Sequence, residues 1–301
     1  MTDYGHDLKF GAFITPVNQP PAHPVDLAIA ADRAGLDLVT FQDHPYQSRF
    51  HDTWTLLSYV AAKTSRVHVS GNVINLPLRQ PAVLARAAAG LDLLSGGRFE
   101  LGIGAGGFWD AIESMGGRRL SPGQAVTALE EAIQIIRGIW DTDARGGVRV
   151  DGDYYRVAGV KRGPAPAHDI NIWVGAYKPR ILDTVGRVAD GWLPSLVNIP
   201  GGPDGLTEMN RRIDDGARAA GRDPADVRRL LNISGRFTGA SGGLLVGPPA
   251  QWAEQLAELT LEHGTSGFIL MTDDAPTIER YAAEVAPATR ELVAAARSGK
   301  A

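Results

Sequence analysis

The stretch LKFGAFITPVNQPPAHPVDLAIAADRAGLDLVTF, residues 8–41, contains one complete strand–helix–strand unit. Residues 8–14 form an apolar run that predicts a buried strand, and residues 23–34 repeat apolar side chains with the period of an amphipathic helix. Gly35 ends the predicted helix, because glycine readily adopts the left-handed conformation that closes helices. A second apolar run, residues 36–41, predicts another strand. Two strands joined through such a helix pair in parallel, so this unit indicates an α/β fold.

The same alternation of strand and helix occurs eight times along the chain. Strict alternation predicts parallel strands, and eight units without a large second domain favour a closed (β/α)8 TIM barrel. An open doubly wound sheet is the less favoured alternative, because such sheets commonly have about five to seven strands. We therefore expect residues 1–301 to form a single barrel domain. The predicted strands are residues 8–14, 36–41, 67–74, 99–103, 170–174, 191–194, 227–233 and 267–271.

One segment interrupts this alternation. Residues 147–157, GVRVDGDYYRV, separate the fourth predicted helix from the fifth strand. They alternate apolar and polar side chains around Asp151-Gly152, the preferred pair of a two-residue type I′ turn. The pattern predicts a small β-hairpin inserted into the barrel.

Composition excludes several classes of protein. The chain has no cysteine, so disulfides, zinc–thiolate sites and a thiol nucleophile are excluded. Its net charge is −4 with acids and bases interleaved, which argues against nucleic-acid binding. No apolar run approaches the roughly 18 residues of a membrane span, and the polar N-terminus lacks the apolar core of a signal peptide. We expect a cytoplasmic protein.

Two polar positions follow predicted strands at the end where barrels carry their active sites. Asp43 and His44 come directly after the second strand, and His44 titrates near neutral pH and can move protons. Alternatively, Asp43 caps the turn and His44 is a surface residue. Asn72 and Asn75 lie inside the otherwise apolar third run, where amides at the barrel mouth can hold a flat polar ligand or simply finish a turn.

Two glycine-containing loops complete the predicted site. Gly104, Ala105 and Gly106 follow the fourth strand, where glycine lets backbone approach a ligand closely or merely makes a flexible turn. Residues 175–178, Gly-Ala-Tyr-Lys, follow the fifth strand and precede a helix that starts at proline. Backbone N–H groups, the helix dipole and a lysine suit a phosphate there. The glycines within residues 239–243 are the rival phosphate site, because barrels commonly bind phosphate after the seventh and eighth strands.

Several motifs together resemble the bacterial luciferase-like family of flavin-dependent oxidoreductases. The resemblance spans almost the whole chain, and the combination of SGGRFELGIGAG with ADGWLP is specific to it. The motifs are FQDHPY at 41–46, VINLPLRQPAVLARAAAGLDLLSGGRFELGIGAG at 73–106, WVGAY at 173–177, VGRVADGWLP at 185–194 and GFIL at 267–270.

This resemblance implies a barrel that binds FMN or the deazaflavin coenzyme F420 across the strand ends and transfers a hydride. Asp43 and His44 match the acid–histidine pair beside the ring, with the acid orienting the histidine. Asn72-Val73 matches the place where many F420-dependent members have a non-proline cis peptide. The remaining cofactor-binding residues are Gly104, Ala105, Gly106, Gly175, Ala176 and Tyr177, to which our electrostatic argument adds Lys178. The family also implies a homodimer.

Departures from the family pattern bear on substrate and cofactor. Members that oxidise sugar phosphates with F420 have a tryptophan and a glutamate where this chain has Ser48 and Gly107, which argues against that substrate. The stretch GAGGFWDAIESMGG at 104–117 and the compact chain favour F420 over FMN. The alternatives are an FMN-dependent monooxygenase that uses oxygen and a flavin-binding barrel without catalysis. A metal-dependent hydrolase is disfavoured because the seven histidines are scattered, and we predict no metal site.

Overall fold

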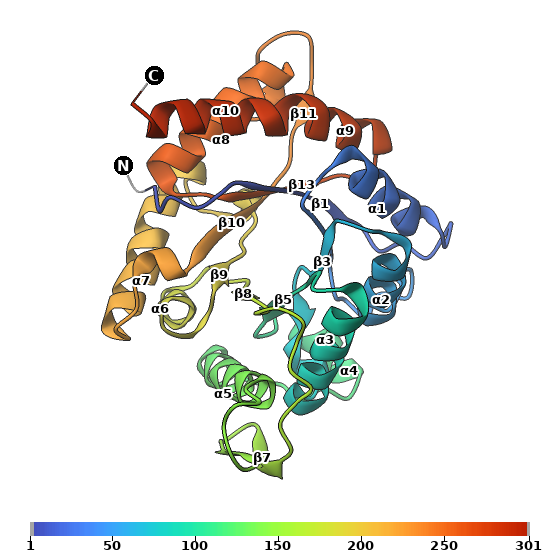
Figure 1. The fold of residues 1–301 in the computed structure, drawn as a ribbon, viewed down its shortest axis with the longest axis vertical. Helices are drawn as coiled ribbons and strands as arrows, with labels where there is room; N and C mark the ends of the chain where they lie inside the picture. The colour runs from blue at the N-terminus through green and yellow to red at the C-terminus, as the bar shows by residue number, and fades with distance from the viewer. Residues whose placement is uncertain (1–2, 300–301) are drawn as a thin grey trace.

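The computed structural model describes residues 3–299, which form a closed barrel of parallel strands inside a ring of helices (Figure 1). Pairing of β3 with β5, through Val69 and Phe99, closes the ring of eight barrel strands. The predicted (β/α)8 barrel is therefore confirmed. The barrel strands are β1 (Lys9–Ile14), β2 (Leu38–Phe41), β3 (His68–Gly71), β5 (Phe99–Gly104), β8 (Ile172–Val174), β9 (Gly191–Trp192), β10 (Arg228–Ile233) and β13 (Gly267–Met271).

Helices cover the outside of the barrel, and short elements lie in the connecting loops. None of the helices in residues 3–299 combines the length and the apolar character needed to cross a membrane. The helices are α1 (His23–Ala34), α2 (Thr53–Lys63), α3 (Pro81–Ser95), α4 (Trp109–Ser114), α5 (Pro122–Trp140), α6 (Pro179–Val188), α7 (Gly205–Ala219), α8 (Pro249–His263), α9 (Ala275–Arg280), the π-helical turn η5 (Tyr281–Val285) and α10 (Ala286–Arg297). The short elements are η1 (Leu76–Leu78), η2 (Leu196–Asn198), η3 (Gly202–Asp204), η4 (Pro224–Asp226), β4 (Ile74–Asn75), β11 (Arg236–Phe237) and β12 (Val246–Gly247).

Local sequence signals set the ends of these helices. Ser121 caps α5 in a capping box, in which its side chain bonds the Gln124 N–H and the Gln124 side chain bonds the Ser121 N–H. Proline occupies the first turn of α1, α3, α5, α6 and α8, where its missing N–H costs no helical bond. Gly35 and Gly96 end α1 and α3 with φ values of 90° and 72°. These are the left-handed caps that glycine accommodates best.

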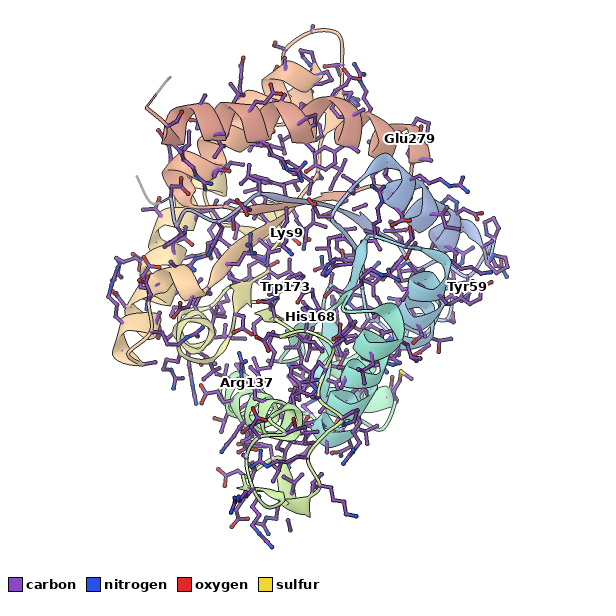
Figure 2. All side chains as sticks on the ribbon, in the orientation of Figure 1. Lys9, Tyr59, Arg137, His168, Trp173 and Glu279 are labelled. Carbon is purple, nitrogen blue, oxygen red and sulfur yellow. The ribbon has the colours of Figure 1, made fainter. Side chains whose placement is uncertain are left out.

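The barrel interior is filled by apolar side chains that point inward from the strands. These residues form a cluster separate from the larger core between strands and helices, and they are Leu38, Trp173, Leu193, Leu230 and Ile269. Trp173 lies near the centre of the ring of strands (Figure 2). The interior is therefore a packed core, so a ligand must bind at an end of the barrel.

Close backbone contact at the third strand requires glycine. A Cβ on Gly102 would lie 2.0 Å from the Gly71 carbonyl oxygen, where β5 passes β3.

The third predicted strand is not continuous, which corrects the run expected over residues 67–74. β3 ends at Gly71, the Asn72–Val73 peptide bond is cis, and the chain resumes as β4 and η1. The cis geometry agrees with the family resemblance.

The inserted hairpin is present but its turn was wrongly predicted. β6 (Val148–Asp151) pairs antiparallel with β7 (Arg156–Val160), beside α5 (Figure 1). The connection therefore comprises residues 152–155 instead of the two-residue Asp151-Gly152 turn. The Glu131 carboxylate on α5 accepts hydrogen bonds from the backbone N–H groups of residues 153, 154 and 155. These tertiary bonds stabilise the wider loop.

The two ends of the described chain lie close together (Figure 1). Arg297 at the end of α10 donates through Nε to the Asp3 carboxylate at 2.7 Å, and through Nη2 to the His6 carbonyl at 3.0 Å. These bonds attach the last helix to the segment that precedes β1.

Candidate active site

A cavity of about 620 Å³ lies at the C-terminal ends of the barrel strands. Apolar and aromatic side chains alternate on its wall with amides, hydroxyls and glycine backbone. Of the residues predicted from sequence, those lining the cavity are Asp43, His44, Asn72, Val73, Gly104, Ala105, Gly106, Gly175 and Tyr177. Ala176 and Lys178 are not in the lining. The strand ends therefore bring most of the predicted residues to one place.

Asp43 is committed to a structural ion pair and does not orient His44. Its side chain is buried, at 1% exposure. Arg79 donates through Nε to Oδ2 at 2.8 Å and through Nη2 to Oδ1 at 2.9 Å, and the Asn75 N–H donates to Oδ2 at 2.9 Å. Within residues 3–299 no hydrogen bond joins Asp43 to His44, and the carboxylate accepts from Arg79 and Asn75 instead. Arg79 was not predicted as the partner of Asp43. The available signal was a basic residue shortly after the third predicted strand, at the same end of the barrel as this acid.

His44 lies on the cavity wall between two aromatic rings. Its ring stacks on Tyr46 at 5.3 Å between centroids, and Phe108 meets it edge-on at 5.2 Å. Burial lowers the pKa of His44 below its usual 6.5, while the nearby charge of Asp43 opposes that shift. The imidazole is therefore neutral at pH 7, with one nitrogen able to donate and the other to accept.

A buried amide pair forms the floor of the cavity. Asn72 Nδ2 donates to Asn232 Oδ1 at 2.7 Å, and Asn232 Nδ2 donates back to Asn72 Oδ1 at 3.1 Å. Asn232 also donates to Ser195 Oγ at 3.1 Å. Asn72 was predicted, but Asn232 and Ser195 were missed. The only sequence signal for Asn232 was a lone polar residue in the apolar part of its strand.

Two polar atoms in this lining have no partner within residues 3–299. They are the Oδ1 atom of Asn75 and the hydroxyl of Tyr46, and both are buried. A buried polar atom without a hydrogen bond costs about 1–3 kcal/mol. Both belong to residues that line the cavity, so a shift of either side chain would let a bound polar molecule satisfy them.

Val73 is held between the two glycine loops. A Cβ on Gly104 would lie 2.6 Å from Val73 Cγ2, and a Cβ on Gly175 would lie 3.4 Å from the same side chain. Gly104 thus leaves the space that Val73 occupies, whereas a Cβ on Gly107 in the same loop would meet nothing within 4 Å. The side chain after the cis bond consequently forms a small apolar surface between the loops.

The loop after β8 is anchored by hydrogen bonds at its centre. The Trp192 indole donates to the Ala176 carbonyl at 2.9 Å, and the Ser195 N–H donates to the Tyr177 hydroxyl at 2.8 Å. Lys178 is the exposed N-cap residue of α6. Ile181, in the first turn of that helix, lines the cavity, so this helix end lies beside it.

Most of the remaining candidates from the sequence lie outside the cavity. The rival phosphate loop at residues 239–243 is exposed and contributes nothing to the cavity lining. Of the two substrate-related departures, Ser48 is exposed and outside the lining, while Gly107 lies within it.

Residues 8–235 match the luciferase-like monooxygenase family. An F420-dependent glucose-6-phosphate dehydrogenase from Amycolatopsis mediterranei is 30% identical over 233 residues, covering 75% of this chain and 68% of that protein. A 5,10-methylenetetrahydromethanopterin reductase from Methanolobus tindarius is 32% identical over 220 residues, covering 73% of this chain and 63% of that protein.

A solved structure supports the same fold. The F420-dependent secondary alcohol dehydrogenase in complex with an F420–acetone adduct has a TM-score of 0.81, with 19% identity and coverage of 94% of this chain and 99% of that chain. At this identity the likeness concerns the fold. The family match covers well over half of the chain and agrees with the motifs. The chain therefore belongs to the luciferase-like monooxygenase family of oxidoreductases.

Proposed function

We propose that the protein is an F420-dependent oxidoreductase that transfers a hydride between the coenzyme and an organic substrate. The main support is the cavity of about 620 Å³ at the strand ends, with an amide floor and unpartnered buried polar atoms. Relatives at about 30% identity are F420-dependent enzymes by name, which favours this coenzyme over FMN. The expected single-domain organisation, homodimer and cytoplasmic location stay predictions.

The cavity residues fit a flat, polar heterocycle. Within the described residues, Asn75 Oδ1 and the Tyr46 hydroxyl are buried without partners. The Asn72–Asn232 pair can only accept a further bond through its carbonyl oxygens, because its N–H groups are all used. Val73 and the neighbouring glycines would contact the face of a ring, because they line the cavity and the glycines add no side chain to it. When bound, F420 supplies the ring carbon that accepts or donates the hydride.

The phosphate-bearing side chain of the coenzyme would leave the cavity toward α6. Ile181 brings the first turn of this helix to the cavity, and a helix N-terminus presents unpaired N–H groups with a favourable dipole. Lys178 lies at the N-cap position and is exposed, so it would attract an anion from outside the cavity. Ala176 would act through its backbone, since its carbonyl fixes the loop.

Neutral His44 would donate to, or accept from, a reacting oxygen of the substrate. Its position on the cavity wall and its lowered pKa suit proton transfer near neutral pH. Asp43 is assigned a different role from the one expected from sequence. It is a positioning residue that holds Asn75 and Arg79 and lies behind the histidine.

The substrate we propose is a neutral, partly apolar organic molecule. Among residues 3–299, the lining contains no lysine or arginine to bind a sugar phosphate. Gly107 also replaces the glutamate of the sugar-phosphate-oxidising members. The apolar part of the wall that remains for a substrate consists of Phe13, Phe108, Ile181, Leu193 and Met271.

An equilibrium titration with F420 and FMN, each oxidised and reduced, tests the cofactor assignment by fluorescence. We expect micromolar or tighter binding of F420 and much weaker binding of FMN. Preference for reduced FMN would redirect the search to oxygen-dependent chemistry, and binding of neither would remove the cofactor assignment.

A matched pair of variants locates the binding site. Gly104→Ala places a methyl group 2.6 Å from Val73 and should raise the Kd for F420 at least tenfold. Gly107→Ala adds the same methyl to the same loop where nothing lies within 4 Å, so its Kd should change less than threefold. Equal Kd values for the two variants would contradict the proposed site.

A further inference from the structure

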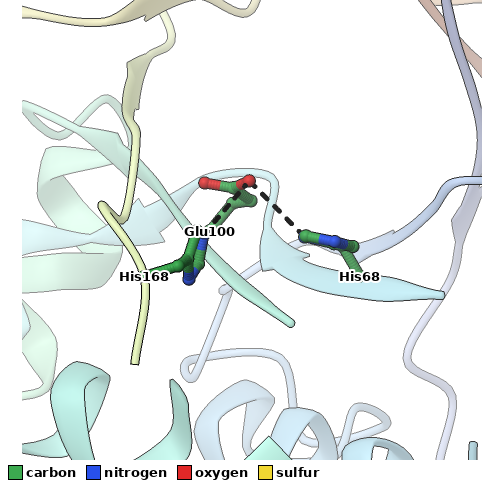
Figure 3. Close-up of side chains that lie close together, drawn as sticks. All are labelled: His68, Glu100 and His168. Carbon is green, nitrogen blue, oxygen red and sulfur yellow. Dashed lines mark ion pairs between the residues drawn. The ribbon is translucent and has the colours of Figure 1, made fainter. Parts of the chain in front are cut away.

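Three potential metal ligands meet at the opposite end of the strands from the cavity. His68 is the first residue of β3, Glu100 is the second residue of β5, and His168 precedes β8 (Figure 3). One ligand atom from each lies within 4.8 Å of the others. The two histidines are far apart in the sequence. For that reason the sequence pattern predicted no metal site.

The separations between these atoms are too long for good hydrogen bonds. His68 Nδ1 lies 3.5 Å from Glu100 Oε1, and His168 Nε2 lies 3.7 Å from the same oxygen. Hydrogen bonds from nitrogen to oxygen span about 2.7–3.2 Å. Two ligands on one tetrahedral zinc, with bonds of about 2.0–2.1 Å, lie roughly 3.3 Å apart. These two gaps are therefore close to those of atoms that share a metal ion, while the two histidine nitrogens lie within 4.8 Å of each other.

Both ring nitrogens that face the glutamate are buried without a hydrogen-bond partner in residues 3–299. Glu100 itself is buried, at 1% exposure. The buried carboxylate needs a compensating positive charge, which a protonated His168 supplies when no ion is bound, because Glu100 and Asp92 raise its pKa to about 9. A metal ion supplies that charge and satisfies all three atoms at once.

The other atoms of two of these ligands are already fixed. His168 Nδ1 bonds Asp92 Oδ1 at 2.9 Å, which leaves Nε2 facing the glutamate. Glu100 Oε2 accepts from the Asn171 N–H at 2.9 Å and from Asn171 Nδ2 at 3.0 Å, which leaves Oε1 free. A carboxylate behind a histidine and hydrogen bonds to a ligating carboxylate are the outer partners that metal sites use.

We propose that His68, Glu100 and His168 bind one divalent transition-metal ion, preferably Zn²⁺, at the base of the barrel. Two imidazole nitrogens and a carboxylate oxygen are a zinc ligand set, and a cysteine-free chain has no thiolate to compete. Each histidine side chain is 30% exposed, so the site lies near the surface, and a water molecule would complete the coordination. The ion joins β3, β5 and the entry to β8, and its role is structural.

The test is a titration of tag-free protein, stripped with a chelator, with Co²⁺ as a coloured probe and Zn²⁺ as competitor. We expect one equivalent of Co²⁺ to give tetrahedral visible absorption bands that Zn²⁺ abolishes. Zn²⁺ should also raise the Tm of the stripped protein, because it binds only the folded chain at this site.

Variants assign the ligands. His68→Gln and His168→Gln should each lower the Co²⁺ affinity at least tenfold. His263→Gln, which removes a histidine at the end of α8, should leave both stoichiometry and affinity unchanged. Retained F420 binding or an unchanged circular-dichroism spectrum shows that a variant is folded, so the test does not depend on the proposed function.

Two results would overturn the proposal. One is the absence of Co²⁺ and Zn²⁺ binding up to millimolar concentration in the stripped, folded protein. The other is binding that His68→Gln and His263→Gln weaken equally, because that would place the ion elsewhere.

Discussion

At the scale of single residues, the ion pair between Arg79 and Asp43 fixes the chain that lines the cavity. Asp43 is buried, and Arg79 donates to both of its oxygens while also reaching Asp52 at 3.1 Å. Removing one partner leaves an uncompensated buried charge, which commonly costs about 3–5 kcal/mol. The same ion pair holds Asn75 through the shared carboxylate, so it also positions an unpartnered cavity atom.

Arg79→Met should therefore lower the free energy of unfolding by about 3–5 kcal/mol in urea denaturation. Arg211→Met is the control, because its ion pairs lie on the exposed face of α7 and such pairs contribute at most about 1 kcal/mol. A loss for Arg79→Met no larger than for the control would show that the ion pair does not support the site.

His44→Ala should lower turnover by about 10²–10⁴-fold if the imidazole moves a proton in the reaction. The Kd for F420 should change little, because the ring lies on the wall and not on the amide floor. Steady-state kinetics with a coenzyme titration separate the two quantities. A loss below tenfold would limit His44 to positioning.

The pKa of His44 gives a prediction for pH dependence. Burial lowers it below the unfolded value of about 6.5. The neutral ring therefore contributes stability that is present above pH 6.5 and is lost as pH falls through the folded pKa. A proton NMR titration, assigned with His44→Ala, should place this pKa below 6.5. A value above 6.5 would mean that the Asp43 charge outweighs burial.

At the scale of elements, strand β5 depends on glycine where it passes β3. Gly102→Ala would put a methyl group 2.0 Å from a backbone oxygen, and should cost at least about 3 kcal/mol of unfolding free energy. Gly90→Ala, inside α3 with open space around it, should instead add about 0.5–1 kcal/mol. Urea denaturation of both variants tests this, and similar stabilities would contradict the contact.

Elements with local signals were predicted closely from sequence. β13 spans 267–271, as the sequence predicted, because the short apolar run is bounded by polar residues on both sides. The third strand and the hairpin turn were predicted less well. The third strand is interrupted at the cis Asn72–Val73 bond, which the family resemblance indicated but the apolar pattern did not. The hairpin loop is held by the Glu131 carboxylate on α5, a tertiary contact that the local pattern does not contain.

The cavity residues likewise divide into those that the local sequence predicted and those that only the folded structure brings together. Asp43 and His44 could be placed at the strand ends from their position alone. Arg79 could not be assigned as the partner of Asp43, because this required the path of η1 back toward β2. Asn232 and Ser195 meet Asn72 only when the barrel closes, so no short motif contains them.

For the whole molecule, coenzyme binding should stabilise the closed barrel. The cavity is lined from many strand ends, so a ligand there contacts segments that come together only in the folded state. At a concentration of 100 times its Kd, F420 should add about 2.7 kcal/mol to the free energy of unfolding. A thermal-shift series with F420 measures this, and a Tm independent of coenzyme concentration would contradict it.

The bond between Arg297 and Asp3 has a consequence for engineering the chain. Since the first and last described segments are adjacent, a short linker can join them without distorting the barrel. New ends can then be opened in the exposed loop at residues 239–243. Such a circular permutant would begin its barrel at the eighth strand, and it should fold and keep the cavity because that loop does not line it.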